Sequence, residues 1–195
     1  MNIIKSVGYS DTEILKSILA LYVPSGVFDL DPTYSKGNFY KEIPKPNYCS
    51  DLNPQDELTL NGDATNLHWI KDNNISSIVF DPPFMFGTHG QTKNNIMNKR
   101  FTMFNNFGEL ETMYKKSLKE FYRILVVGGY LFFKCQDYTD SKTTMTHCLI
   151  LEWALEQKFY AQDLFILISQ RRIYNPKLKQ IHARKFHSYW WIFRK

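Results

Sequence analysis

The sequence predicts an α/β protein in which a mostly parallel sheet carries helices on both faces. Two observations support this fold class: short apolar strand patterns alternate with amphipathic helical patterns, and several strand patterns end at acidic or proline residues. The chain of 195 residues is 44% hydrophobic and 16% aromatic, so it can bury a substantial core. Because no repeat, linker or low-complexity tract interrupts these patterns, we expect one domain over residues 1–195.

The first half of the chain contains a helical pattern followed by four strand patterns. Ser10-Asp11-Thr12-Glu13 has the pattern of a helix N-cap, and an apolar helical stripe follows it. Residues 23–26 end this predicted helix in a turn. The strand patterns lie at residues 27–31, 48–51, 59–63 and 78–81, and a short helix is predicted at 66–72. Each of these strand patterns ends at an aspartate.

The second half of the chain continues the alternation. Helices are predicted at residues 109–125 and 142–157, and strands at 130–135, 160–168 and 187–193. Polar loops are predicted at 88–106 and 170–185. Trp190 and Trp191 belong to the last strand, where we expect them to pack in the core.

The stretch around which the other motifs are arranged is Asp81-Pro82-Pro83-Phe84. It follows the apolar run Ile78-Val79-Phe80, and the strand must stop there because two consecutive prolines donate no N–H. A carboxylate is thereby placed at the carboxyl end of a strand, where open α/β sheets bind ligands. The Asp81 carboxylate and the Pro82 carbonyl can both accept hydrogen bonds from an exocyclic amine, while Phe84 offers a face to the attached ring. The tetrapeptide therefore indicates a site for a planar molecule that carries an amino group.

Four aspartates, Asp31, Asp51, Asp63 and Asp81, fall at or just beyond the ends of the first four predicted strands. In a parallel sheet these strand ends share one edge. A ligand with a ribose, an exocyclic amine and a positive centre would use such a series of carboxylates. Asp51 would accept from two ribose hydroxyls, Asp63 would lie near an adenine amine, and Asp31 or its loop would lie near an ammonium group.

These motifs resemble the class I S-adenosylmethionine-dependent methyltransferases, and among them the amino-methyltransferases that act on adenine N6 or cytosine N4 of nucleic acids. The signature of that group, Asp/Asn/Ser-Pro-Pro-aromatic after the fourth strand, is matched in full by Asp81-Pro82-Pro83-Phe84. Residues 28–37 resemble the cofactor loop after the first strand, and Asp51 and Gly62-Asp63 resemble the next two cofactor motifs. The loop departs from the family in having one glycine, Gly37, where two or three are usual.

The resemblance implies a Rossmann-like class I methyltransferase fold, with a seven-stranded, mostly parallel sheet, an antiparallel last strand and helices on both faces. It implies S-adenosylmethionine as the cofactor, held by Asp31, Pro32, Thr33, Tyr34, Gly37, Asp51, Asp63, Ala64 and Asp81. The catalytic residues would be Asp81, Pro82, Pro83 and Phe84, with Phe84 stacking on a base flipped out of its helix. The implied reaction is direct methyl transfer to a base amine, with DNA as the favoured substrate and no need for a metal.

A nucleic-acid partner also agrees with the charge of the chain. The 24 basic and 19 acidic residues give a net charge of +5, and residues 170–185 hold six basic residues without an acidic one. We expect phosphate contacts from Lys93, Lys99, Arg100, Arg171, Arg172, Lys177, Lys179 and Arg184. Since the chain shows no separate target-recognition domain, we expect specificity to be short, relaxed or supplied by a separate subunit or a second copy in a homo-oligomer.

Other residue patterns exclude several classes of protein. No apolar run approaches membrane-spanning length and the first residues lack a secretory signal, so we expect a cytoplasmic protein without a membrane partner. Cys49, Cys135 and Cys148 are odd in number and lack metal-ligand spacing, and the five histidines form no metal triad. We therefore assign no metal site.

The residues leave two alternative functions open. The same chemistry could act on RNA, because related enzymes methylate base amines in RNA and nothing in the sequence separates the two substrates. The chain could also be a catalytically silent nucleic-acid-binding subunit, which the single loop glycine favours and the intact Asp81-Pro82-Pro83-Phe84 opposes. A protein-glutamine methyltransferase is disfavoured, because that group usually has Asn at the position of Asp81.

Overall fold

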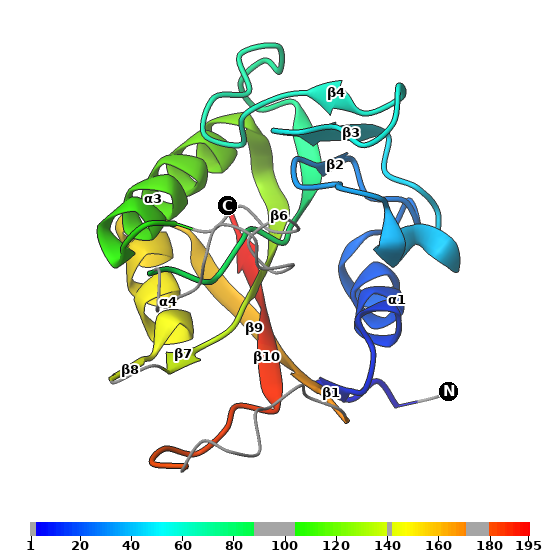
Figure 1. The fold of residues 1–195 in the computed structure, drawn as a ribbon. Coiled ribbons are helices and arrows are strands. Elements are labelled where there is room, and N and C mark those ends of the chain that lie inside the picture. Colours follow the sequence, from blue (N-terminus) through cyan, green and yellow to red (C-terminus); the bar gives the residue numbers. More distant parts are fainter. Residues whose placement is uncertain (1–2, 88–103, 140–141, 171–179) are drawn as a thin grey trace.

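The computed structural model describes residues 3–87, 104–139, 142–170 and 180–195, and an eight-stranded sheet forms its centre (Figure 1). The strands lie in the order β1-β9-β10-β6-β5-β2-β3-β4. Their pairings are parallel except for those of β10, which is antiparallel to both β6 and β9. This is the arrangement of a Rossmann-like class I methyltransferase fold, and the predicted fold class is confirmed.

The main sheet contains eight strands of very different length. They are β1 (Val7–Gly8), β2 (Leu30–Asp31), β3 (Tyr48–Asp51), β4 (Leu60–Asn61), β5 (Ile75–Phe80), β6 (Leu125–Cys135), β9 (Tyr160–Ile168) and β10 (His187–Arg194). A small second sheet pairs β7 (Tyr138–Thr139) with β8 (Thr143–Thr144). The described helices are α1 (Asp11–Tyr22), the 3-10 helix η1 (Asn38–Lys41), α3 (Phe107–Ile124) and α4 (Thr146–Glu156).

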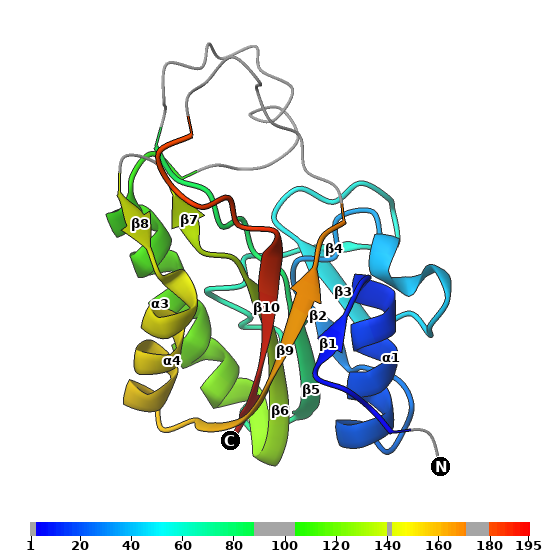
Figure 2. The same ribbon diagram turned by 90° about the horizontal axis from the view of Figure 1, so that it is seen from below.

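Helices cover both faces of the sheet, with α1 on one face and α3 and α4 on the other (Figure 2). Successive side chains of the central strands point to opposite faces. Ile78 and Phe80 of β5 join the core under α3 and α4, whereas Val79 joins the core under α1. Trp190 is fully buried and Trp191 packs half-buried against the other core, so their predicted place in the core is confirmed.

Side-chain caps set the first residues of the two longer helices. The Ser10 hydroxyl accepts a hydrogen bond from the Glu13 N–H at 3.1 Å, and the Asn106 side chain accepts one from the Glu109 N–H at 3.0 Å. Both helices were predicted from their apolar stripes, and the predictions are confirmed to within a few residues. No helix in the described ranges has the length and apolar composition needed to cross a bilayer.

The sheet contains one strand more than the seven that were predicted. β1 adds to the outer edge of β9 in a parallel pairing, with Val7 opposite Ile166. A strand of two residues is too short to show a period, so the sequence pattern could not reveal it. Its pairing depends on an edge that β9 supplies from the far end of the chain.

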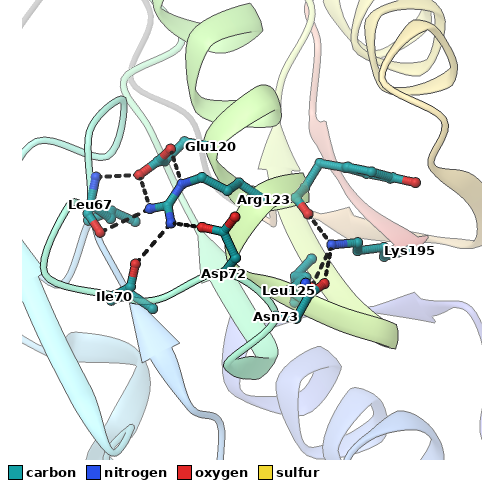
Figure 3. A network of polar contacts seen from close by, with 9 residues as sticks. Leu67, Ile70, Asp72, Asn73, Glu120, Arg123, Leu125 and Lys195 are labelled. Atoms are coloured by element: carbon teal, nitrogen blue, oxygen red, sulfur yellow. Dashed lines mark hydrogen bonds and ion pairs between the residues drawn. The ribbon is translucent and has the colours of Figure 1, made fainter.

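Residues 66–72 form turns, so the predicted short helix is wrong. The Glu120 carboxylate of α3 accepts a hydrogen bond from the Leu67 N–H at 2.7 Å, and Arg123 donates to the carbonyls of Leu67 and Ile70 (Figure 3). Side chains of α3 therefore bind backbone N–H and carbonyl groups of this segment and hold it in turns. This tertiary contact overrides the local pattern.

Two other predicted elements are shorter in the structure. The strand predicted at 27–31 is reduced to β2. The Asp29 N–H donates to the Ser77 hydroxyl at 2.8 Å, and the Ser76 N–H donates to the Asp29 carboxylate at 2.8 Å, so side chains replace strand pairing here. The helix predicted at 142–157 begins at Thr146, because Thr143–Thr144 pairs with β7 as β8.

Candidate active site

The four predicted aspartates lie at the carboxyl ends of neighbouring parallel strands. Asp31 and Asp51 are the last residues of β2 and β3, Asp81 directly follows β5, and Asp63 lies two residues beyond β4. Since β4, β3, β2 and β5 are consecutive in the sheet, one edge carries all four. The chain order runs outward in both directions from β2, so the boundary between β2 and β5 is the switch point at which open α/β sheets bind ligands.

Asp31 shapes the loop that follows β2. Its side chain is fully buried, and its carboxylate accepts hydrogen bonds from the Thr33 N–H at 2.8 Å, the Thr33 hydroxyl at 3.0 Å and the Tyr40 hydroxyl at 2.6 Å. Burial raises the pKa of Asp31 to about 7, although the three hydrogen bonds oppose the rise. A direct contact of Asp31 with a cofactor stays a prediction, while its role in holding the loop is visible.

The single glycine of this loop has a steric role. Gly37 has a φ of +62°, and its N–H donates to the Tyr34 carbonyl at 2.8 Å. A Cβ at this position would overlap the Tyr34 hydroxyl, so no other residue fits without moving that ring. The Tyr34 N–H donates to the Ser50 carbonyl at 3.1 Å, which ties the loop to β3, and the buried Pro32 begins it.

Asp51 and Asp63 have acceptor capacity that suits a nucleoside. Each oxygen of the Asp51 carboxylate accepts one backbone N–H at 2.8 Å, from Ser35 and from Asn53. The exposed Asp63 accepts the Thr65 N–H at 2.8 Å, next to the buried Ala64. Because an ionised carboxylate offers about four acceptor sites, Asp51 can still accept from two ribose hydroxyls. The acceptor set on this edge therefore fits the nucleoside part of S-adenosylmethionine.

The tetrapeptide after β5 is held from two sides. The Asp81 N–H donates to the Thr33 hydroxyl at 2.9 Å, and the Pro83 carbonyl accepts from the Tyr114 hydroxyl of α3 at 2.8 Å. Pro82 is buried, whereas Phe84 and the Asp81 side chain are partly exposed, the latter by 25%. The bond to Thr33 joins the two motifs that the sequence singled out, because Thr33 is itself held by Asp31.

A cavity of about 190 Å³ lies beside this tetrapeptide. Its lining includes Phe84, Lys134, Gln136, Ser169, His187 and Ser188, at the carboxyl ends of β6 and β9 and the start of β10. Gln136 is nearly buried and donates to the His187 carbonyl at 2.9 Å. With Leu167 and Cys135 completing it, the lining combines apolar groups and rings with several polar groups, which suits a planar, hydrogen-bonding molecule.

Sequence reasoning missed a lysine that faces Asp81. The Lys134 ammonium lies 3.4 Å from an Asp81 oxygen and 3.1 Å from an Asp11 oxygen, and its side chain is 14% exposed. The signal was present, because a lysine within the apolar run Leu131-Phe132-Phe133 needs an acidic partner once it is buried. The hydroxyl donors Tyr40 and Tyr114 were also missed, because their partners lie in other elements and no local pattern marks them.

One of the predicted phosphate-binding residues lies in the part of the chain that the structure describes. Lys93, Lys99, Arg100, Arg171, Arg172, Lys177 and Lys179 lie outside the described residues, and the described Arg184 is exposed near the start of β10. Within the described ranges, no group of three or more His, Cys, Asp or Glu side chains is arranged to hold a metal ion.

No family model matches the chain, and no curated protein matches it. A similar solved structure is a putative DNA modification methylase from Thermus thermophilus complexed with S-adenosyl-L-methionine, with 18% identity and a TM-score of 0.49. That match covers 69% of this chain and 53% of the other, so this chain spans about half the length of the Thermus protein.

Two further structures match over nearly the whole chain. An rRNA methylase from Streptococcus thermophilus has 18% identity and a TM-score of 0.48, with 99% of each chain covered. A putative methyltransferase from Streptococcus mutans in complex with SAH has 14% identity and a TM-score of 0.43, with 99% of this chain and 100% of the other covered. These likenesses concern the fold alone. The strand order and directions define the class, which is the fold of S-adenosylmethionine-dependent methyltransferases.

Proposed function

We propose that the chain is an S-adenosylmethionine-dependent methyltransferase that methylates an exocyclic amine of a nucleic-acid base, with adenine N6 or cytosine N4 of DNA as the favoured target. The observation that carries the proposal is the position of Asp81-Pro82-Pro83-Phe84. It directly follows β5 at the switch point of the sheet, is bonded to the loop after β2 through Thr33, and has a cavity beside Phe84.

The residues that would hold the cofactor line one side of this switch point. Asp51 would accept from the ribose hydroxyls, Asp63 and Ala64 would lie at the adenine, and the loop that Asp31 and Gly37 shape would enclose the remainder. S-adenosylmethionine supplies, when bound, a methyl group on a positively charged sulfur. The carboxylates on this edge would favour that charge.

The target amine would be held on the other side of the switch point. The ionised Asp81 carboxylate and the Pro82 carbonyl would each accept one N–H of the amine. An aromatic amine is a poor nucleophile because its lone pair is delocalised into the ring, and these two hydrogen bonds favour a pyramidal nitrogen. Most of the rate enhancement would then come from positioning.

The base would reach this site only outside a helix. The partly exposed Phe84 offers a face on which a flipped base can stack, next to the polar lining of the cavity. The net charge of +5 and the basic residues at 170–185 support an anionic partner. DNA and RNA both present flipped bases and phosphates, so an assay on each substrate is needed to tell them apart.

Calorimetry and methyl-transfer assays test the proposal. We expect the purified chain to bind S-adenosylmethionine and to transfer tritiated methyl groups to unmodified DNA, with RNA assayed in parallel. Asp81→Ala should lower the rate by at least about 100-fold, because it removes an acceptor aimed at the reacting group. Lys16→Met, which alters an exposed pair with Glu42, should leave the rate unchanged.

Each contrary outcome points to a different error. Equal rates in wild type and Asp81→Ala would remove Asp81 from the mechanism. Transfer to RNA alone would move the substrate to RNA, and nucleoside mass spectrometry of the product would show whether adenine or cytosine is modified. A chain that binds nucleic acid without transferring methyl groups would be a silent subunit.

A further inference from the structure

Lys134 is a largely buried cation that lies between two carboxylates. It lies near the carboxyl end of β6, and its ammonium contacts Asp81 at 3.4 Å and Asp11 of α1 at 3.1 Å. The rings of Phe39 and Trp190 lie 4.8 Å and 5.7 Å from it. The aromatic rings and the protein core leave 14% of the side chain exposed, so the ion pairs are screened little by water.

Asp11 is fixed independently of Lys134. The indole N–H of Trp190, which is fully buried in β10, donates to the same Asp11 oxygen at 3.0 Å. Asp11 also lies in the first turn of α1, for which Ser10 is the N-cap residue. Three elements, α1, β6 and β10, therefore determine where the Lys134 ammonium lies relative to Asp81.

The groups that face Asp81 favour its neutral form, with one exception. Burial raises the pKa of Asp81, and the nearby Asp11 carboxylate raises it further, whereas the Lys134 ammonium lowers it. Asp31, Tyr114 and Cys135 also interact electrostatically with Asp81, and each would add negative charge if ionised. In the described part of the chain, Lys134 is the only cationic side chain in ionic contact with Asp81.

We propose that Lys134 is a positioning residue that keeps the Asp81 carboxylate ionised and oriented, so that it can accept a hydrogen bond from the target amine. The inference rests on the proposed function, because an ionised carboxylate only accepts hydrogen bonds, whereas a protonated one also donates. The Asp11 carboxylate contacts Lys134 and, through its charge, opposes the ionisation of Asp81. In Asp11→Asn the amide oxygen can still accept from Lys134 while the charge is lost, so Asp11→Asn and Lys134→Met make predictions of opposite sign.

The pH dependence of methyl transfer tests this inference. In Lys134→Met, whose side chain keeps most of the stem without the charge, the rise of rate with pH should move to higher pH. At pH values below this rise, the rate should fall about tenfold for each unit by which the pKa of Asp81 increases, and it should recover as the pH increases. Asp11→Asn should move the same rise to lower pH, and Lys134→Arg should restore the wild-type profile.

Ionisation of Asp81 can be read without any substrate. Carboxyl carbon NMR of aspartate-labelled protein, with the Asp81 signal identified by its loss in Asp81→Asn, should show Asp81 titrating at higher pH in Lys134→Met than in wild type. Lys16→Met serves as the control, because it also removes a lysine next to a carboxylate, at a pair in which both side chains are at least half exposed. In Lys16→Met the Asp81 signal should titrate as in wild type.

Specific results would overturn the inference. If Asp81 titrates at the same pH in wild type, Lys134→Met and Asp11→Asn, then Lys134 does not control its ionisation. If calorimetry shows that Lys134→Met loses affinity for S-adenosylmethionine with an unchanged Asp81 titration, then Lys134 is a cofactor ligand. If Lys134→Met does not fold, two variants still test the inference. Asp81 should titrate at lower pH in Asp11→Asn than in wild type, and at the wild-type pH in Lys134→Arg. A wild type that transfers no methyl groups would refute the proposed function, while the NMR titration would still decide the role of Lys134.

Discussion

Two clusters of charged residues lie at opposite ends of the sheet and are built differently. At the amino ends of β5 and β6, Arg123 of α3 donates to Glu120 and Asp72, at 2.6 Å each, and to two backbone carbonyls (Figure 3). At the carboxyl ends, the Lys134 ammonium contacts Asp81 and Asp11 at longer distances of 3.4 Å and 3.1 Å. The first cluster satisfies its charges with many short hydrogen bonds, and the second leaves two carboxylates to share one cation.

The pKa shifts of the two clusters have opposite meanings. The hydrogen bond from Arg123 lowers the pKa of Glu120, and the reciprocal bond raises the pKa of Arg123, so both charged forms are stabilised. Burial raises the pKa of Asp31 and of Asp81, so their neutral forms are favoured. Carboxylates held against their charged state are typical of functional sites, whereas a satisfied network is typical of structural support. The contrast therefore assigns structural support to the amino ends, and it agrees with the active site proposed at the carboxyl ends.

Removing Arg123 should produce the largest loss of stability. Arg123→Met leaves the largely buried Glu120 without its cation. It also removes the side-chain donor to the Ile70 carbonyl, while the Leu67 carbonyl keeps the Ile70 N–H. Leaving a partly buried carboxylate and a buried carbonyl without their donor costs on the order of 3 kcal/mol of the free energy of unfolding. Urea unfolding measures the change, and methyl transfer by the folded fraction should be unaffected.

The exposed pair of Lys16 with Glu42 provides the matched control for Arg123. Both side chains are at least half exposed, so Lys16→Met should change the free energy of unfolding by less than about 1 kcal/mol. If Arg123→Met cost no more than this control, the contrast between the two ends of the sheet would be broken.

Asp31 should give the carboxyl end an unusual pH dependence of stability. Its pKa is about 7 in the folded protein and has an ordinary value of 3.8. Between these values the folded state binds one more proton than the unfolded state, so the free energy of unfolding falls as the pH rises from about 4 to about 7. The full fall is on the order of 4 kcal/mol.

The neutral variant Asp31→Asn isolates this contribution. Carboxylates with lowered pKa values, such as Glu120, make stability rise with pH near 4, and they act equally in both proteins. Denaturant titration at pH 4, 5.5 and 7 measures the free energy of unfolding of wild type and of Asp31→Asn. As the pH rises, wild type should therefore lose stability relative to Asp31→Asn. A difference that stays constant with pH would show that Asp31 is ionised over the whole range.

What the sequence could predict at this site was the set of strand ends. β3 and β9 have the bounds predicted for them, and Asp31, Asp51 and Asp81 stand where acidic or proline residues stop an apolar run. Those signals are local, because proline removes a donor and aspartate favours turns wherever they occur. These strand ends and their carboxylates therefore followed from the pattern alone, whereas the switch point follows from the strand order in the structure.

What the sequence could not predict was which groups meet across elements. In the sequence, Asp11 looks like an ordinary acidic residue in the first turn of a helix. Its contacts with Lys134 and Trp190 exist only because β6 and β10 pack against α1. The turns at 66–72 were predicted as a helix for the same reason, since Arg123 and Glu120 act on them from α3. Contacts between distant segments override local propensity in both places.

The smallest expected effect compares two glycines at opposite ends of the sheet. Gly26, in the turn before β2, and Gly37, in the loop after it, have similar positive φ values of +72° and +62°. A Cβ at Gly26 would meet nothing within 4 Å, whereas one at Gly37 would overlap the Tyr34 hydroxyl. Gly26→Ala should cost only the left-handed backbone penalty of about 1–2 kcal/mol.

Gly37→Ala should add to that penalty the displacement of Tyr34. This ring stacks on Tyr40, whose hydroxyl binds Asp31, so moving it disturbs the loop that would enclose the cofactor. We expect Gly37→Ala to destabilise the protein somewhat more than Gly26→Ala and, unlike it, to weaken binding of S-adenosylmethionine in calorimetry. Equal affinities in the two variants would show that the cofactor does not depend on the shape of this loop, and the carboxyl end would then differ from the amino end in its charges alone.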